Sequence, residues 1–81
     1  MSQDTTIKDG FVDSVLKQID SGDPPEARDT YDRLIDEGHS NSETLHLMAA
    51  ALRTEMKHML EQSKPFDNAH YAELLKKLPA L

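Results

Sequence analysis

The chain has 81 residues, with nine Lys or Arg, fifteen Asp or Glu and no cysteine. This length allows a single compact domain, and without thiols the chain has no disulfides, thiolate zinc sites or cysteine nucleophiles. A net charge of −6 disfavours binding to nucleic acid or anionic lipid. The longest apolar run, residues 47–52, is far short of the roughly 20 residues that span a bilayer. No secretory leader is recognised, so we expect a cytoplasmic protein without membrane association.

The first predicted helix is defined by apolar residues that advance by three or four positions. Ser21-Gly22 supplies its stop, and Gly10 weakens its first turn. We therefore expect residues 1–6 to form a flexible N-terminus and residues 7–81 to form one helical domain. The stripe consists of Ile7, Phe11, Val12, Val15, Leu16 and Ile19.

Clear stop and start signals separate the second predicted helix from the third. Asp23 is a suitable N-cap for a helix that opens with Pro24-Pro25. Gly38 suits the left-handed position after a helix end. Ser40 and Glu43 have the spacing of a capping box for the next helix. The inward residues of the second helix are Ala27, Tyr31, Leu34 and Ile35.

The third predicted helix, about residues 41–62, is the longest. A weaker apolar strip of Leu47 and Ala51 lies apart from its main face, so this helix should be central and have neighbours on two sides. Its broad apolar face comprises Leu45, Met48, Ala49, Leu52, Met56, Met59 and Leu60.

A short fourth helix is predicted after Pro65-Phe66, with Asp67 as its cap and its end before Pro79. Its apolar residues are Tyr71, Leu74, Leu75 and Leu78. Four helices with short connections predict an all-α fold, a small antiparallel bundle.

The spacing carboxylate-x-x-His recurs three times, and di-iron bundle proteins use Glu-x-x-His to present metal ligands to a core site. Glu55 and His58 flank the core stripe of the third helix, so they are the candidate metal ligands, which a dimer could bring together in two copies. The simpler interpretation, which we adopt here, is a solvated or interfacial hydrogen-bonding pair, so no metal ligand is assigned from the sequence. His70 is interpreted as a surface residue. The three pairs are Glu43 with His46, Glu55 with His58, and Asp67 with His70.

Catalytic machinery is not recognisable in the sequence. A nucleophilic enzyme needs a Ser or Thr, a His and an acid held together, and Ser40 beside His39 is more simply explained as an N-cap. The three glycines are isolated, so they form no phosphate-binding loop. We therefore predict a protein that is not an enzyme and has no resident cofactor.

Self-association is expected because so short a chain buries little apolar surface by itself. Leu47 and Ala51, joined by Met48 and Met59, are the predicted interface of a homodimer. The methionines themselves are more simply explained as core filling, because they interleave with leucines on one face. The leading interpretation is a non-enzymatic interaction or structural module that self-associates through its third helix. A metal-binding helical protein, with a carboxylate/His site at a dimer interface, is the rival interpretation.

Acidic residues gather around the second predicted helix. Such a cluster usually forms a solvated face, but it could also accept a basic protein partner. Its members are Asp20, Asp23, Glu26, Asp29, Asp32, Asp36 and Glu37.

Several short motifs, taken together over residues 25–79, have a family likeness. They are Tyr31-x-x-Leu34-x-x-x-Gly38-His39-Ser40-x-x-Glu43, then Ala49 to Glu55, then Pro65-Phe66-Asp67-x-x-x-Tyr71 and Leu78-Pro79. This pattern resembles small uncharacterised bacterial helical proteins, in which a Gly-His/Tyr-Ser turn precedes a long Ala-rich helix. The resemblance implies a bacterial, cytosolic, all-helical protein, and it transfers no catalytic residue.

Overall fold

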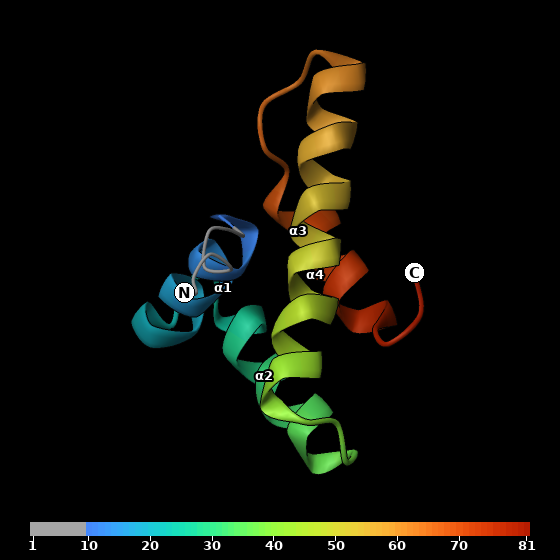
Figure 1. Cartoon of the computed structure of the whole chain (residues 1–81). Helices are drawn as coiled ribbons and strands as arrows, with labels where there is room; N and C mark the ends of the chain where they lie inside the picture. The colour runs from blue at the N-terminus through green and yellow to red at the C-terminus, as the bar shows by residue number, and fades with distance from the viewer. Residues whose placement is uncertain (1–9) are drawn as a thin grey trace, which may run out of the picture.

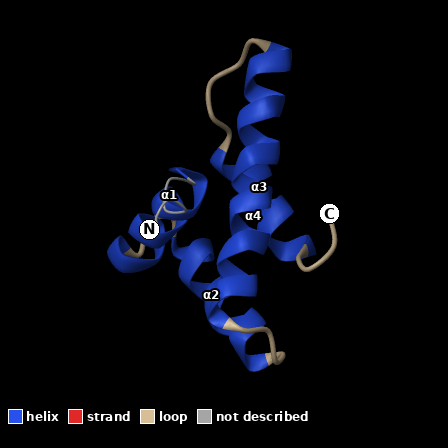
Figure 2. Ribbon diagram, viewed as in Figure 1, coloured by secondary structure: helices blue, strands red, loops and turns tan. Residues whose placement is uncertain are grey.

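The structure is a computed structural model that describes residues 10–81. Over this range the chain forms four helices and no strand: α1 (Gly10–Ser21), α2 (Pro25–Asp36), α3 (Asn41–Gln62) and α4 (Asn68–Lys77) (Figures 1 and 2). The predicted all-α fold, a small helical bundle, is confirmed. The predicted flexible segment 1–6, like Ile7 of the first stripe, lies outside the described residues. Within residues 10–81 no helix is both long and apolar enough to cross a bilayer.

Helix α3 is the central element, because it packs against each of the other three helices. Figure 1 shows α2 running back along the first half of α3, with α1 and α4 beside its middle. The buried core draws on all four helices. Its apolar members are Val15, Ala27, Leu34, Leu45, Met48, Ala49, Ala51, Leu52, Tyr71, Leu74, Leu75 and Leu78.

The predicted helix boundaries hold closely where small polar residues cap a helix. Ser40 Oγ accepts a hydrogen bond of 3.0 Å from the backbone N–H of Glu43 at the start of α3. The Glu43 carboxylate does not return to Ser40, because it lies 3.0 Å from Nδ1 of His39. Gly38 has the expected positive φ, 102°. One expectation was wrong: the N-cap of α2 is Pro24, without a side-chain cap, and not Asp23.

Two of the four predicted interface residues belong to the core. Met48 and Ala51 are both 0% exposed within the single chain. The physical reason is that α1, α2 and α4 all pack on α3, so its second apolar side is already covered by the chain itself. These two side chains are therefore not free to contact another molecule. Leu47 and Met59, the other two, are partly buried.

The predicted core face of α3 is not buried along its whole length. Leu60 was expected in the core, but it is 74% exposed, and Met56 and Met59 are only partly buried. Figure 1 shows why: the last turns of α3 extend past the other helices and have only the connection to α4 beside them. The C-terminal end of α3 therefore presents apolar surface to solvent.

Candidate metal centre

Glu55 is a charged residue at a core position. It lies one turn after Ala51 and Leu52 on the buried side of α3, and its side chain is 0% exposed. A carboxylate removed from water is strongly destabilising unless it is paired or hydrogen-bonded. The partners of Glu55 therefore define what this part of the molecule can do.

One oxygen of Glu55 is held by the backbone of the α3–α4 connection. Oε2 accepts a hydrogen bond of 3.0 Å from the backbone N–H of Asp67. Ser63, with a φ of 52°, ends α3 in the left-handed conformation that reverses the chain. Asp67 then caps α4 by accepting a hydrogen bond of 3.1 Å from the backbone N–H of His70. This backbone path returns the start of α4 to the side of Glu55.

The other oxygen of Glu55 faces two imidazole rings. Oε1 is in direct hydrogen-bonding contact with Nδ1 of His70, and it lies 3.9 Å from Nδ1 of His58. The two rings have their centroids 4.5 Å apart and are tilted by 37°. One donor atom from each of the three residues lies within 4.8 Å of the other two. We call this group the Glu55/His58/His70 centre.

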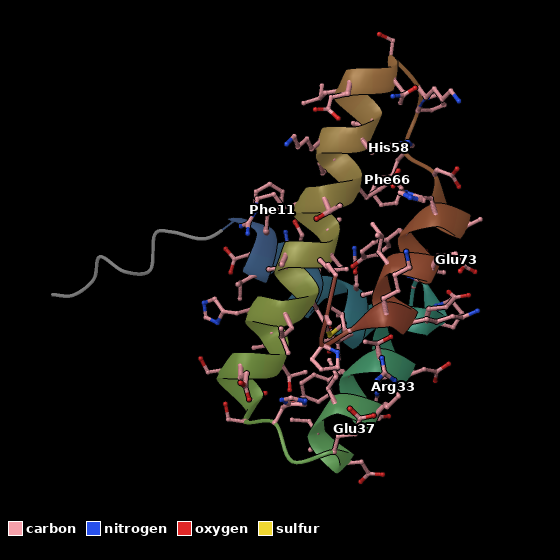
Figure 3. The ribbon with its side chains drawn as sticks, turned by 90° about the vertical axis from the view of Figure 1, so that its right-hand side faces the viewer. Phe11, Arg33, Glu37, His58, Phe66 and Glu73 are labelled. Atoms are coloured by element: carbon pink, nitrogen blue, oxygen red, sulfur yellow. The ribbon has the colours of Figure 1, made fainter. Side chains whose placement is uncertain are left out.

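The centre is closed on its carboxylate side and open on its imidazole side. The side chains of His58 and His70 are 39% and 37% exposed, whereas that of Glu55 is 0% exposed. Figure 3 places His58 on the side of α3 that faces the connection to α4. Solvent therefore reaches the centre past the imidazole rings.

Helix α4 is fixed next to the centre by the residue that follows His70. The Tyr71 ring is fully buried and makes an edge contact with Phe66 at a centroid distance of 5.5 Å. Its hydroxyl donates a hydrogen bond of 2.7 Å to Oε1 of Gln18 on α1. Burial raises the pKa of Tyr71 to about 12. These contacts restrict where the neighbouring His70 can lie.

The spacing of the three donors is close to that of a metal site. Zinc binds imidazole nitrogen and carboxylate oxygen at about 2.0–2.2 Å, so tetrahedral ligand atoms lie about 3.3 Å from one another. The separation of 3.9 Å between Glu55 and His58 needs a small inward shift. The contact between Glu55 and His70 would have to open so that an ion could replace the hydrogen bond. Without an ion, the same residues form a buried carboxylate hydrogen-bonded to an imidazole.

The structure brings the Glu55/His58 pair together with the histidine of a second carboxylate-x-x-His pair. Glu55 and His58 lie together as expected, but His70 joins them, although it was interpreted as a surface residue. The third donor therefore comes from α4 of the same chain and requires no second copy. The missed signal was the pair Asp67 and His70 directly after a short connection, which folds the start of α4 back onto the end of α3.

The first of the three pairs does not form a site with the others. Glu43 lies beside His39, and Nδ1 of His46 is 2.8 Å from the carbonyl oxygen of Ser42. Both residues of this pair are exposed at the N-terminal end of α3. Glu43 and His46 therefore serve as natural comparison residues for the centre.

Comparisons with protein families, with curated proteins and with solved structures found no match to this chain. The resemblance to small bacterial helical proteins therefore stays a prediction, and it is the geometry of the centre that indicates a function.

Proposed function

We propose that this protein binds one divalent transition-metal ion, of the zinc type, through the Glu55/His58/His70 centre. The observation that carries the proposal is a fully buried carboxylate faced by two imidazoles from two different helices, with donor atoms within 4.8 Å of one another. Buried carboxylates in proteins are either paired or bound to metals. The three donors all come from one chain, so the ion needs no dimer.

The donor set determines the class of ion. Two imidazole nitrogens and one carboxylate oxygen suit Zn²⁺, Co²⁺, Ni²⁺ or Fe²⁺. Mg²⁺ and Ca²⁺ prefer sites made of oxygen ligands. The hydrogen bond from the backbone N–H of Asp67 to Glu55 would orient the carboxylate, which is a common outer-shell feature of metal ligands. The centre is therefore expected to prefer transition metals.

The role of the ion in this proposal is to stabilise the fold. Glu55 and His58 belong to α3 and His70 to α4, so an ion between them would link the two helices. Small chains without disulfides often gain stability from a metal or from a partner. Because binding is linked to folding, the ion would raise the free energy of unfolding. The proposed function is therefore metal binding that stabilises the fold.

Native mass spectrometry and thermal unfolding of untagged, chelator-treated protein test the proposal. We expect one Zn²⁺ per chain and a higher melting temperature with Zn²⁺ or Co²⁺, but not with Mg²⁺ or Ca²⁺. At a free concentration about 100 times Kd the stabilisation should be about 2.7 kcal/mol. His70→Ala and His58→Ala should each weaken binding at least about 10-fold.

The matched controls are His46→Ala on α3 and His39→Ala, which remove imidazoles away from the centre. Both should bind zinc like the original chain. The proposal is overturned if the original protein takes up no ion, or if His46→Ala weakens binding as much as His70→Ala does. In either case the centre is a hydrogen-bonded anchor without metal.

Self-association is the second candidate function, and the exposed apolar end of α3 favours it. Leu60 is 74% exposed, and Met59 beside it is only partly buried. A contiguous exposed apolar patch marks a surface that binds another molecule, and Leu60 with Met59 would form the centre of such a patch. In this version of the proposal a cytoplasmic homodimer forms through Leu60 and Met59, without Met48 and Ala51, because Leu47 lies about 20 Å away along α3 and packs against the core.

Sedimentation of the Leu60→Glu variant tests self-association. We expect a lower mass than that of the original protein and an unchanged melting temperature of the monomer, because residue 60 is outside the core. Gln62→Glu adds the same charge at the same helix end and should leave the mass unaltered. If the original protein is already a monomer at high concentration, this candidate is discarded.

A further inference from the structure

We propose that an ion in the Glu55/His58/His70 centre keeps one coordination position open to solution, and that this position takes a small monoanion. The inference rests on the proposed metal site and adds what that site can bind. Three facts carry it: the number of donors, the occupation of the neighbouring oxygens, and the exposure of the imidazoles.

The chain supplies three donors, whereas zinc ordinarily has four ligands. Across residues 10–81, no fourth histidine or carboxylate joins the group of Glu55, His58 and His70. A centre with three protein ligands and an external fourth ligand is the arrangement of open zinc sites, in contrast to closed structural sites with four protein ligands. The donor count therefore favours an open position.

The nearest oxygens are already engaged in hydrogen bonds. Oε2 of Glu55 accepts the backbone N–H of Asp67 at 3.0 Å, so bidentate coordination by Glu55 would compete with that bond. Oδ1 of Asp67 accepts the backbone N–H of His70 at 3.1 Å and caps α4. Turning either oxygen towards the ion would weaken the hydrogen bond that it accepts at the start of α4. Water or a solute can fill the position without that loss.

The direction of the open position follows from burial. Glu55 closes the protein side, while His58 and His70 are more than one third exposed. A fourth ligand would therefore approach between or beside the two rings, from solvent.

The charge of the loaded centre selects the ligand. A divalent ion with one carboxylate and two neutral imidazoles retains one uncompensated positive charge, which favours a small monoanion. The net charge of the whole chain, −6, opposes the approach of large polyanions. Azide and formate are therefore suitable probes, because each is small, carries a single negative charge and binds through one donor atom.

Visible spectroscopy of the cobalt-loaded protein tests this inference. Adding azide should change the cobalt absorption bands until one azide is bound per cobalt ion. Formate should compete with azide for this position. The His46→Ala variant should respond like the original chain. Asp67→Asn, which keeps a side chain able to cap α4, should respond in the same way because Asp67 is not a ligand.

The possible failures are distinguishable. A protein that gains no cobalt bands overturns the proposed metal site itself. Cobalt bands that azide leaves unchanged overturn the open position and leave the metal site intact. If the Asp67→Asn variant then becomes responsive, the fourth ligand is the Asp67 carboxylate. If dilution to a monomer makes the protein responsive, a second copy supplies the fourth ligand.

Discussion

The hydroxyl of Tyr71 on α4 donates a hydrogen bond of 2.7 Å to Oε1 of Gln18 on α1. The two residues come from the first and last helices of the described chain, and the Tyr71 ring between them is fully buried. This bond satisfies a hydroxyl that has little access to water. It also holds α4 in the position that brings His70 to Glu55.

The first prediction concerns stability at alkaline pH. The pKa of Tyr71 is raised by burial from 10.0 to about 12, so between these values the folded state keeps a proton that the unfolded state releases. The contribution of Tyr71 to stability should therefore be complete below pH 10 and should be lost as the pH rises towards 12, by roughly 3 kcal/mol in all. Urea unfolding across this interval measures the slope.

Comparison with Tyr71→Phe separates the loss of stability caused by ionisation of Tyr71 from that caused by titration of the lysines. The variant should be less stable at neutral pH, because Gln18 loses its donor, but its stability should depend less on alkaline pH. Tyr31→Phe, at a half-buried tyrosine, should keep the slope of the original protein. Equal slopes for all three proteins would contradict the assignment to Tyr71.

The second prediction concerns Arg33, which connects α2 to the end of α4. Its guanidinium donates to the carbonyl oxygens of Leu78 at 3.0 Å and Leu75 at 3.1 Å, and it pairs with Glu37 at 3.2 Å (Figure 3). A cation at a helix C-terminus satisfies free carbonyls and complements the helix dipole. Arg33→Gln should therefore lower the free energy of unfolding by about 2 kcal/mol.

Two control variants separate this role from surface charge. Glu37→Gln removes only an exposed ion pair and should change stability by less than about 0.5 kcal/mol. Arg28→Gln, at an exposed arginine of the same helix, should have a similarly small effect. Chemical denaturation of the three variants gives the comparison, and equal losses for Arg28→Gln and Arg33→Gln would refute the capping role.

Much of the fold follows from the sequence, because the residues that mark helix ends agree with the periodic spacing of the apolar residues. Ser40, Gly38 and Asp67 mark helix ends through their own backbone and side-chain chemistry, and these signals act within a few residues. Periodicity also identified α3 as the central helix. It could not reveal how far along α3 its neighbours extend, so Leu60 was assigned to the core and Ala51 to an interface.

Only the part of the candidate centre that lies within one helix could be predicted from the sequence. Glu55 and His58 are separated by three residues of one helix, so their proximity is fixed by helix geometry. His70 reaches Glu55 through the left-handed turn at Ser63 and the backbone hydrogen bond of Asp67, which depend on tertiary packing. A spacing pattern within one helix contains no information about that path.

The third prediction concerns Thr44, a fully buried residue of α3. Its Oγ1 has no hydrogen-bond partner in the part of the chain that the structure describes. A buried hydroxyl without a partner is destabilising, and valine has nearly the same shape without the polar atom. Thr44→Val should raise the free energy of unfolding by about 1 kcal/mol. Thr54→Val, at an exposed position whose hydroxyl donates to Ala50 at 2.9 Å, should not stabilise.

The fourth prediction concerns Glu55 in protein from which all metal has been removed. Its carboxylate accepts the backbone N–H of Asp67 and contacts His70, and Glu55→Ala would leave both groups without their acceptor and create a cavity. The variant should lose about 3 kcal/mol of stability in urea. Hydrogen exchange should locate the loss at the start of α4, the element that Glu55 holds.

Glu61→Ala is the matched control, because Glu61 lies on the same helix and makes only an exposed pair with Lys57 at 4.0 Å. It should change stability by less than about 0.5 kcal/mol. Glu55→Gln keeps one acceptor oxygen for the Asp67 N–H, so its loss should fall between those of the two alanine variants. If Glu55→Ala were as stable as Glu61→Ala, the carboxylate would not anchor α4, and the same contacts could not orient it as a metal ligand.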